Sequence, residues 1–226
     1  MTEWIDLFIR NLPDLLNGLI VTIKMTFTGL AIGIAIGLPI ALMRVYGKGW
    51  VQKFAVGYSE ILRGTPLLVQ LFLIYYGLPD LGILFSRNTA AILALGLNSG
   101  AYQSEYFRGA IQAIGSGQMV AARSIGMKRL QAIRHIILPQ ALRIVIPSWS
   151  NEPVSLIKAS AVIFLIAVPD LMMKARSIIG RIYDPISVYF MVAVIYLIFV
   201  VILTIILNAI EKSLRIPGLK IDAARR

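Results

Sequence analysis

The chain has 226 residues, of which 58% are hydrophobic and only 15% are charged, and the charged residues are clustered between long apolar stretches. A soluble domain of this length is far less apolar, so the composition places the chain among membrane proteins. The net charge of +11 does not indicate nucleic-acid binding, because the basic residues fall where positive charges orient membrane helices, and the absence of cysteine excludes disulfides and thiolate metal sites.

The N-terminal residues 1–18 are acidic and end in no small-residue cleavage pattern, so we expect no signal peptide there. Their apolar residues share one helical face, which predicts a segment lying along the membrane surface. Five apolar stretches that can each cross a bilayer follow, and they run over 18–43, 54–78, 89–113, 137–168 and 187–210. The expected fold is all-α, with one membrane domain over 1–226 and its core over 18–216.

Two local features refine this expectation. The fourth stretch is longer than a span needs, so we expect it to be kinked or to begin outside the hydrocarbon. In the first stretch, Gly29, Gly33 and Gly37 form two overlapping G-x-x-x-G spacings, which allow either close helix contact or dimerisation.

The charges between the stretches predict the orientation. The loop after the first stretch and the loop after the third are basic and contain no acid, whereas the loop after the second is balanced. Since cytoplasmic loops carry the excess of Lys and Arg, we expect the N-terminus outside and the basic C-terminal tail in the cytoplasm. Five spans, an odd number, satisfy this arrangement.

The third loop, residues 117–139, has a characteristic spacing. Two alanines are followed after three residues by a glycine, and after nine more by Ile-x-Leu-Pro; these residues are Ala121, Ala122, Gly126, Ile136, Leu138 and Pro139. The pattern resembles the cytoplasmic EAA loop of ABC importer permeases, although Val120 stands where that family usually has Glu. We expect a helix over 117–125, a turn at Gly126 and a second helix from Met127.

The resemblance implies that this loop docks an ATPase subunit. The two small alanines allow close approach of another protein, and the basic residues Arg123, Lys128 and Arg129 flank them. For the charges alone, an ordinary basic loop that only fixes orientation remains an alternative. The sequence contains no G-x-x-x-x-G-K-[ST] motif, so ATP and Mg²⁺ would bind to a separate ATPase.

The second stretch contains Arg63-Gly64-Thr65-Pro66 about ten residues from its start, near the expected bilayer midplane. Gly64 and Pro66 should break the helix there, with Thr65 as N-cap and Pro66 and Leu67 opening a new half-helix. The free N–H groups of such a half-helix favour a carboxylate, and Arg63 can add a bidentate contact.

Residues 61–76 resemble the second-helix motif of the polar amino acid subfamily of these permeases, and the resemblance covers about 18–216. It implies a type I importer fold, a second permease chain that is identical or a sister, an extracellular or periplasmic binding protein, and a bacterial or archaeal cytoplasmic membrane as location. ATP-driven alternating access is also implied by the family.

Two further polar groups fall at similar depth: Asn98 in the third stretch and Glu152, before Pro153, in the fourth. An acid in hydrocarbon costs about 2.5–3.5 kcal/mol on insertion scales, so Glu152 should face protein or a water-filled cavity. We therefore expect Arg63 and the half-helix to bind the carboxylate of an amino acid and Glu152 to bind its ammonium group. Gln70 and Asn98 could hydrogen-bond the rest.

Several alternatives remain at this point. Arg63 and Glu152 could form an internal ion pair that only holds helices together or gates the path. An ion-coupled secondary amino acid transporter is a second possibility, whereas a membrane enzyme lacks a catalytic or metal-ligand constellation in this sequence. The family often has an Asp at the position of Ala159, and its absence disfavours basic substrates.

Overall fold

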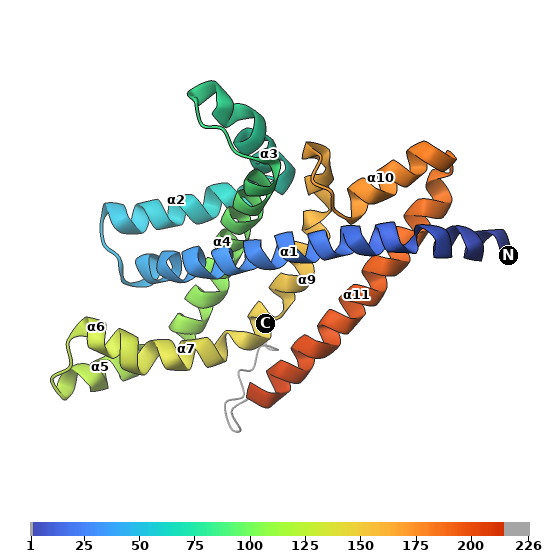
Figure 1. The fold of residues 1–226 in the computed structure, drawn as a ribbon. Coiled ribbons are helices and arrows are strands. Elements are labelled where there is room, and N and C mark those ends of the chain that lie inside the picture. Colours follow the sequence, from blue (N-terminus) through green and yellow to red (C-terminus); the bar gives the residue numbers. More distant parts are fainter. Residues whose placement is uncertain (1, 215–226) are drawn as a thin grey trace.

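The computed structural model describes the backbone of residues 2–214 and the side chains of 6–213, and this part of the chain is entirely helical (Figure 1). The C-terminal tail from 215, used above for orientation, lies outside the described residues. The helices are α1 (Thr2–Tyr46), α2 (Trp50–Gly64), α3 (Leu67–Phe72), η1 (Leu73–Gly77), η2 (Leu78–Leu81), α4 (Arg87–Ala113), α5 (Ser116–Ser124), α6 (Arg129–Ala132), η3 (Ile133–Ile137), α7 (Leu138–Ile144), α8 (Ile146–Trp149), α9 (Asn151–Ala159), η4 (Ser160–Ile166), α10 (Leu171–Ile182) and α11 (Pro185–Leu214).

The packing of α1 against α4 forms the centre of the fold. Small residues bring the two backbones together: a Cβ atom added to Gly37 would lie 2.9 Å from the carbonyl oxygen of Gly100. Gly29 and Gly33 likewise face α4, where Leu95 and Ser99 lie. The G-x-x-x-G spacings of the first stretch therefore serve a helix contact within the chain.

The N-terminal segment forms the first turns of α1 and continues without a break into the first stretch. Its apolar face packs on α10 and α11, where Leu15 is buried in a cluster with Leu171, Ile178 and Val188. Phe8 and Leu12 pack against the same cluster, whereas Ile9 and Leu16 on that face are 60% and 43% exposed, so the placement of this segment along the membrane surface stays a prediction.

One sharp bend divides the second stretch, and another lies at the end of the fourth. The axis bends by 106° between Trp50–Gly64 and Leu67–Leu81, and by 51° between Ile146–Ile166 and Leu171–Ile182. Prolines lie in the first two positions of α7 and α8, where their missing N–H groups cost no helical hydrogen bond. The 51° bend lies at 167–170, at the end of the predicted fourth stretch, and the bent pair begins nine residues later than predicted and extends to Ile182. Whether 137–168 is kinked within the membrane or begins outside it stays a prediction.

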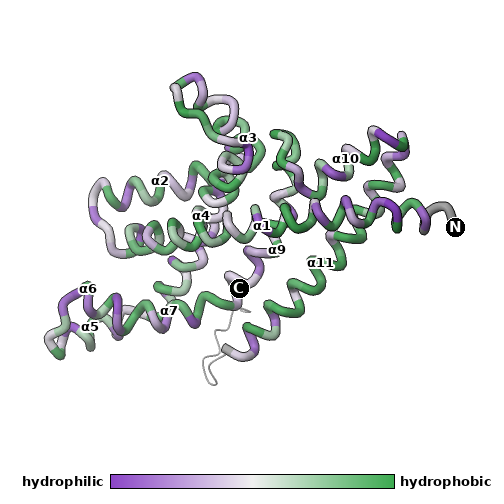
Figure 2. Tube along the Cα trace, in the orientation of Figure 1, coloured by the Kyte–Doolittle hydropathy of each residue, from purple (hydrophilic) through white to green (hydrophobic). Residues whose placement is uncertain are grey.

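Within the described part of the chain, two helices are long and apolar enough to cross a membrane, Asp6–Tyr46 and Pro185–Ser213, and the two bent pairs qualify if each is one span. Figure 2 shows the apolar character of α11 along most of its length, whereas hydrophilic residues gather in the α5–α6 region. Helix α4 has 27 residues, about 40 Å, but is less apolar because it contains several polar side chains. Counting α4 gives the five predicted spans, a number that stays a prediction.

The segment from α5 to η3 lies at the same end of the molecule as the corner between α1 and α2 (Figure 1). Helix α5 ends at Ser124, and Gly126 has a φ of +86°, a conformation that side chains disfavour. The second helix starts at Arg129, two residues after the expected Met127. Arg129 attaches this segment to α1, since Nη2 donates a hydrogen bond to the carbonyl oxygen of Tyr46.

Candidate functional site

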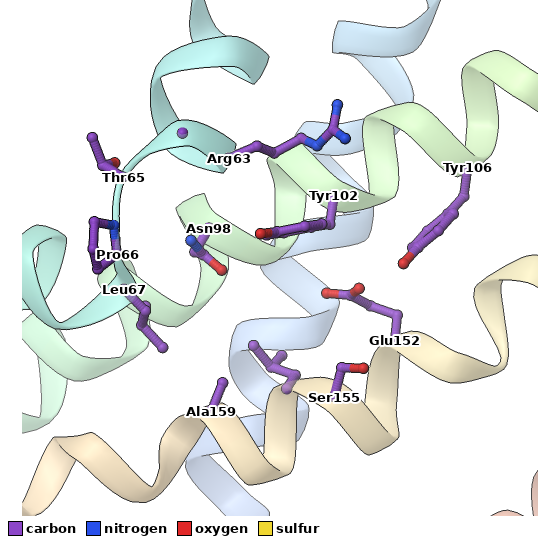
Figure 3. A pocket seen from close by; sticks show the side chains of 12 residues that line it. Arg63, Thr65, Pro66, Leu67, Asn98, Tyr102, Tyr106, Glu152, Ser155 and Ala159 are labelled. Atoms are coloured by element: carbon purple, nitrogen blue, oxygen red, sulfur yellow. The ribbon is translucent and has the colours of Figure 1, made fainter.

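A cavity of about 590 Å³ opens where the break between α2 and α3 faces α4 and α9 (Figure 3). Its walls combine one guanidinium, one carboxylate, hydroxyl and amide groups, and aliphatic side chains. The lining residues are Arg63, Gly64, Thr65, Pro66, Leu67, Asn98, Tyr102, Tyr106, Glu152, Ser155, Leu156 and Ala159. All but one of the substrate-binding residues predicted from the sequence are among them, and the exception is Gln70.

The break in the second stretch lies at Thr65-Pro66, as predicted. Thr65 has an extended backbone, which a residue before proline favours, and Pro66 is extended as well. The predicted capping was wrong, however. Thr65 terminates α2, and its hydroxyl donates a 2.8 Å hydrogen bond back to the carbonyl oxygen of Ile61. Helix α3 begins at Leu67 with Pro66 as its N-cap, so no side chain caps it.

Gln70 supports the break from behind the cavity wall. Its side chain is 5% exposed, and its amide nitrogen lies 2.7 Å from the carbonyl oxygen of Leu62 and 3.0 Å from that of Thr65. The amide of Asn98 donates to its oxygen at 3.2 Å. Gln70 thus satisfies carbonyl groups that lose their helical partners at the break, and it ties α3 to both α2 and α4.

Glu152 enters the cavity from α9 and is 4% exposed. The hydroxyl of Ser99 on α4 donates a 2.6 Å hydrogen bond to Oε1, and the Tyr106 ring points its hydroxyl toward the carboxylate (Figure 3). Arg63 forms its ion pair with Glu105 instead, at 2.9 Å. The Arg63–Glu152 ion pair considered above is therefore not present among the described residues.

Sequence reasoning missed four residues of the lining: Tyr102, Tyr106, Ser155 and Leu156. A signal was available, because Asn98, Tyr102 and Tyr106 follow one another at four-residue intervals and so share one face of α4. The guanidinium of Arg63 lies 5.6 Å from the centre of the Tyr102 ring, within the range of a cation–π contact. Ser155 follows Glu152 by three residues on α9, so these two residues also share one face of their helix.

The arrangement of charges suits a small zwitterion. Arg63, whose side chain is 36% exposed, lies on α2. The neighbouring tyrosine rings belong to α4, and the buried Glu152 projects from α9 on the other side of the cavity (Figure 3). Opposite charges on different walls, with neutral donors and acceptors between them, can bind a ligand that carries both an anionic and a cationic group.

The residues predicted to contact an ATPase fall into two groups in the structure. Ala121, Arg123, Gly126, Lys128 and Arg129 are exposed, whereas Ala122 is 4% exposed and packs inward. Arg123 has a structural role in addition, because its Nη1 donates a 3.0 Å hydrogen bond to the carbonyl oxygen of Met127 across the turn.

Large apolar side chains also project from this segment. Val120, Ile125 and Leu130 are 62%, 79% and 75% exposed, respectively. Three apolar side chains exposed to this degree within eleven residues, among basic residues, are typical of a surface that another protein covers.

The described residues thus form a helical membrane protein with a polar cavity at a helix break and an exposed helical segment at one end. A family model described as binding-protein-dependent transport system inner membrane component matches residues 11–216. The chain belongs to this family. It is a permease component and not an enzyme, and ATP hydrolysis belongs to a separate subunit.

Relatives extend over nearly the full length. The nopaline transport system permease protein NocM of Agrobacterium fabrum is 39% identical over 85% of this chain and 84% of its own length. A putative glutamine transport system permease protein, GlnP of Rickettsia bellii, is 36% identical over 95% of this chain and 99% of its own length. A crystal structure of an amino acid ABC transporter with histidines superposes with a TM-score of 0.84 at 38% identity, covering 91% of this chain and 96% of that one.

Proposed function

We propose that this chain is the permease subunit of an ATP-driven importer that carries polar amino acids across the cytoplasmic membrane by alternating access. The named relatives support the substrate class, since they include permeases of nopaline, glutamine and arginine systems. An ion-coupled mechanism finds no support in these similarities, because the family takes its name from its dependence on binding proteins.

The cavity between α2, α4 and α9 is the proposed substrate site, and the observation that carries this proposal is the buried Glu152 carboxylate in its wall. A carboxylate that is 4% exposed needs a compensating cation or hydrogen bonds, and the partners that Glu152 has, the hydroxyls of Ser99 and Tyr106, are both neutral. The ammonium group of an amino acid supplies that charge. Its carboxylate then faces Arg63, and the absence of an acid at Ala159 favours neutral or acidic side chains over basic ones.

The proposal also covers the topology of the chain and its partner subunits. In this proposal, the chain forms a single domain with five spans, its N-terminus outside and residues 117–139 in the cytoplasm. The latter seat an ATPase subunit that binds ATP and Mg²⁺, through exposed groups such as Arg123, Lys128 and Leu130. A second permease chain, identical or a sister, completes the path, and a binding protein delivers the substrate from outside.

The substrate site is tested by Glu152→Gln in a transporter assembled with its ATPase and binding protein in liposomes. Removing the charge should abolish amino acid uptake while ATP hydrolysis continues, since the ammonium group loses its counter-charge. Glu60→Gln is the matched control, because Glu60 is an exposed carboxylate on α2 outside the cavity lining. Unchanged uptake by the Glu152→Gln transporter would remove this residue from the site.

The docking segment is tested by Gly126→Asp, with Gly117→Asp as control. Both changes add one negative charge to the same exposed segment, but only Gly126 has a positive φ, at +86°. Gly126→Asp should uncouple ATP hydrolysis from uptake because it strains and charges the turn, whereas Gly117→Asp should retain most of the coupling. Equal coupling in the two variants would contradict the assignment of this turn.

A further inference from the structure

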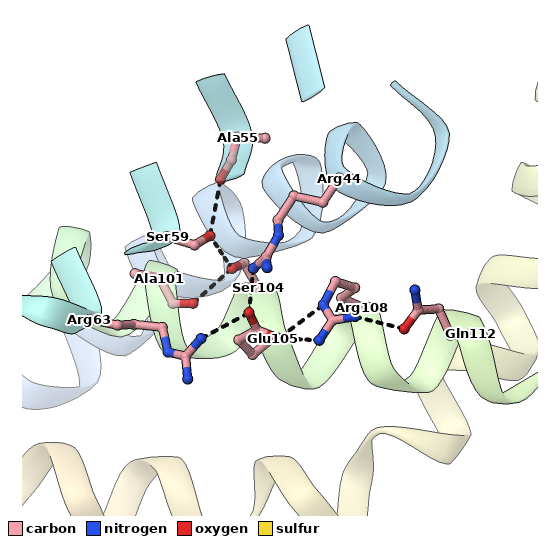
Figure 4. Close-up of polar contacts among 9 residues, drawn as sticks. All are labelled: Arg44, Ala55, Ser59, Arg63, Ala101, Ser104, Glu105, Arg108 and Gln112. Atoms are coloured by element: carbon pink, nitrogen blue, oxygen red, sulfur yellow. Dashed lines mark hydrogen bonds and ion pairs between the residues drawn. The ribbon is translucent and has the colours of Figure 1, made fainter. Parts of the chain in front are cut away.

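Glu105, on α4 beside the cavity, faces guanidinium groups from three helices (Figure 4). Its Oε1 atom lies 2.6 Å from Nη1 of Arg44 on α1 and 2.9 Å from Nη1 of Arg63 on α2. Its Oε2 atom accepts hydrogen bonds from Nε and Nη2 of Arg108, at 2.9 and 2.7 Å. One carboxylate thus serves three cations, and two of these share a single oxygen.

These arginines differ in how firmly the structure fixes them. The side chain of Arg44 is 9% exposed and therefore depends on Glu105 for its counter-charge. Arg108 binds Oε2 through two nitrogens and also donates to Gln112, at 2.8 Å. Arg63 makes a single hydrogen bond to Glu105 and is 36% exposed, and it also lines the cavity. It is the arginine that can leave Glu105 at least cost.

The helices beneath this cluster are fixed to each other. The hydroxyls of Ser59 on α2 and Ser104 on α4 are fully buried and lie 2.9 Å apart, one turn from Arg63 and next to Glu105 (Figure 4). Ser104 also donates to the carbonyl oxygen of Ala101. Because the Ser59–Ser104 hydrogen bond ties α2 to α4, Arg63 can change partner by side-chain rotation alone.

We propose that Glu105 is a positioning residue that competes with the substrate carboxylate for Arg63. This inference rests on the proposed function. In the empty cavity Arg63 is held by Glu105 and stacked near Tyr102; a bound amino acid takes the guanidinium over, and Glu105 remains neutralised by Arg44 and Arg108. Glu105 thereby weakens substrate binding and prevents an unpaired guanidinium in the empty transporter.

The competition predicts opposite effects for two substitutions at the same cluster. Glu105→Gln removes the competitor and should tighten binding about fivefold, the value that corresponds to a partly exposed ion pair. Arg108→Gln leaves Glu105 with fewer cations, so Glu105 should hold Arg63 more strongly and weaken binding. A purely structural role for the cluster predicts that both substitutions weaken binding.

The experiment measures dissociation constants on the assembled permease–ATPase complex without the binding protein. Radiolabelled L-glutamine, L-histidine and L-arginine are the probes, each compared with its α-amide, which keeps the ammonium group but has an uncharged carboxamide in place of the carboxylate. Both substitutions are made in the native background and with Arg63→Gln. We expect opposite shifts for the amino acid, little shift for the amide, and loss of both shifts when Arg63 is replaced.

Shifts of the same sign, or shifts that persist in the Arg63→Gln background, would overturn the competition. If the Glu105→Gln complex does not assemble, Arg108→Gln is compared in the native and Arg63→Gln backgrounds. Weaker binding that disappears with Arg63→Gln supports the proposal, whereas an unchanged dissociation constant, or a weakening that persists, would refute it. Failure of the underlying function looks different: no amino acid would bind to the native complex, or Glu152→Gln would leave binding and uptake intact.

Discussion

The contact between α1 and α4 depends on glycines, and Gly37→Ala tests it. A Cβ atom at this position would lie 2.9 Å from the carbonyl oxygen of Gly100 and 3.1 Å from the backbone nitrogen of Ser104. Both are backbone atoms, which cannot rotate away. The two helices must therefore separate to accommodate one methyl group.

The size of the effect follows from a matched comparison with Gly57→Ala. Gly57 lies in the interior of α2, and a Cβ atom added there would have no other atom within 4 Å, so its replacement changes helix propensity without a steric conflict. Gly37→Ala gains the same propensity but adds overpacking, which costs about 1–3 kcal/mol. We expect the Gly37→Ala chain to be less stable than the Gly57→Ala chain by that amount.

The assay is reversible unfolding of the purified permease in mixed detergent micelles, followed by circular dichroism as the denaturing detergent is titrated. Oligomeric state is monitored in parallel, because the G-x-x-x-G spacing also occurs at dimer contacts. Equal stability of the two variants would refute the steric argument. A Gly37→Ala chain that loses only its oligomeric partner would place this glycine at an interface between chains.

Two further changes test local features. Gln70→Ala should cost about 1–3 kcal/mol in unfolding free energy, because it leaves buried carbonyl groups at the helix break without donors, whereas Gln118→Ala on exposed α5 should cost little. Arg129→Ala removes a hydrogen bond to the backbone of Tyr46 and a cation–π contact with its ring, at 5.3 Å, and should speed hydrogen exchange in α5 and α6. Arg134→Ala is the control. Equal exchange rates in the two variants would contradict the attachment of this segment to α1 through Arg129.

Local chemistry made the helix break at Thr65-Pro66 and half of the cavity lining predictable from the sequence. Proline restricts the residue before it, so the break at Thr65-Pro66 follows from two adjacent residues. The partner of Arg63 was not predictable in this way. Glu105 is 42 positions away on another helix, and only the packing of α2 on α4 brings the two charges together.

The role of Thr65 shows a subtler limit. A threonine before a proline fits the start of a helix, but its hydroxyl can equally donate back to the carbonyl oxygen four residues earlier. The structure has the second arrangement, with Ile61 as acceptor. Sequence alone does not rank the two, because the outcome depends on Gln70 reaching the carbonyl groups at the break.

Helix α4 contacts a different neighbour on each side. Tyr102 and Tyr106 face the cavity, Gly100 fits against α1, and Ser104 binds α2. The described contacts of α4 therefore involve several neighbouring helices at once. Helix α11, in contrast, presents a broad exposed apolar surface on which one apolar residue can replace another. Over evolutionary time α4 should drift slowly and α11 quickly, and changes in α4 should become permanent only together with changes in the helices around it.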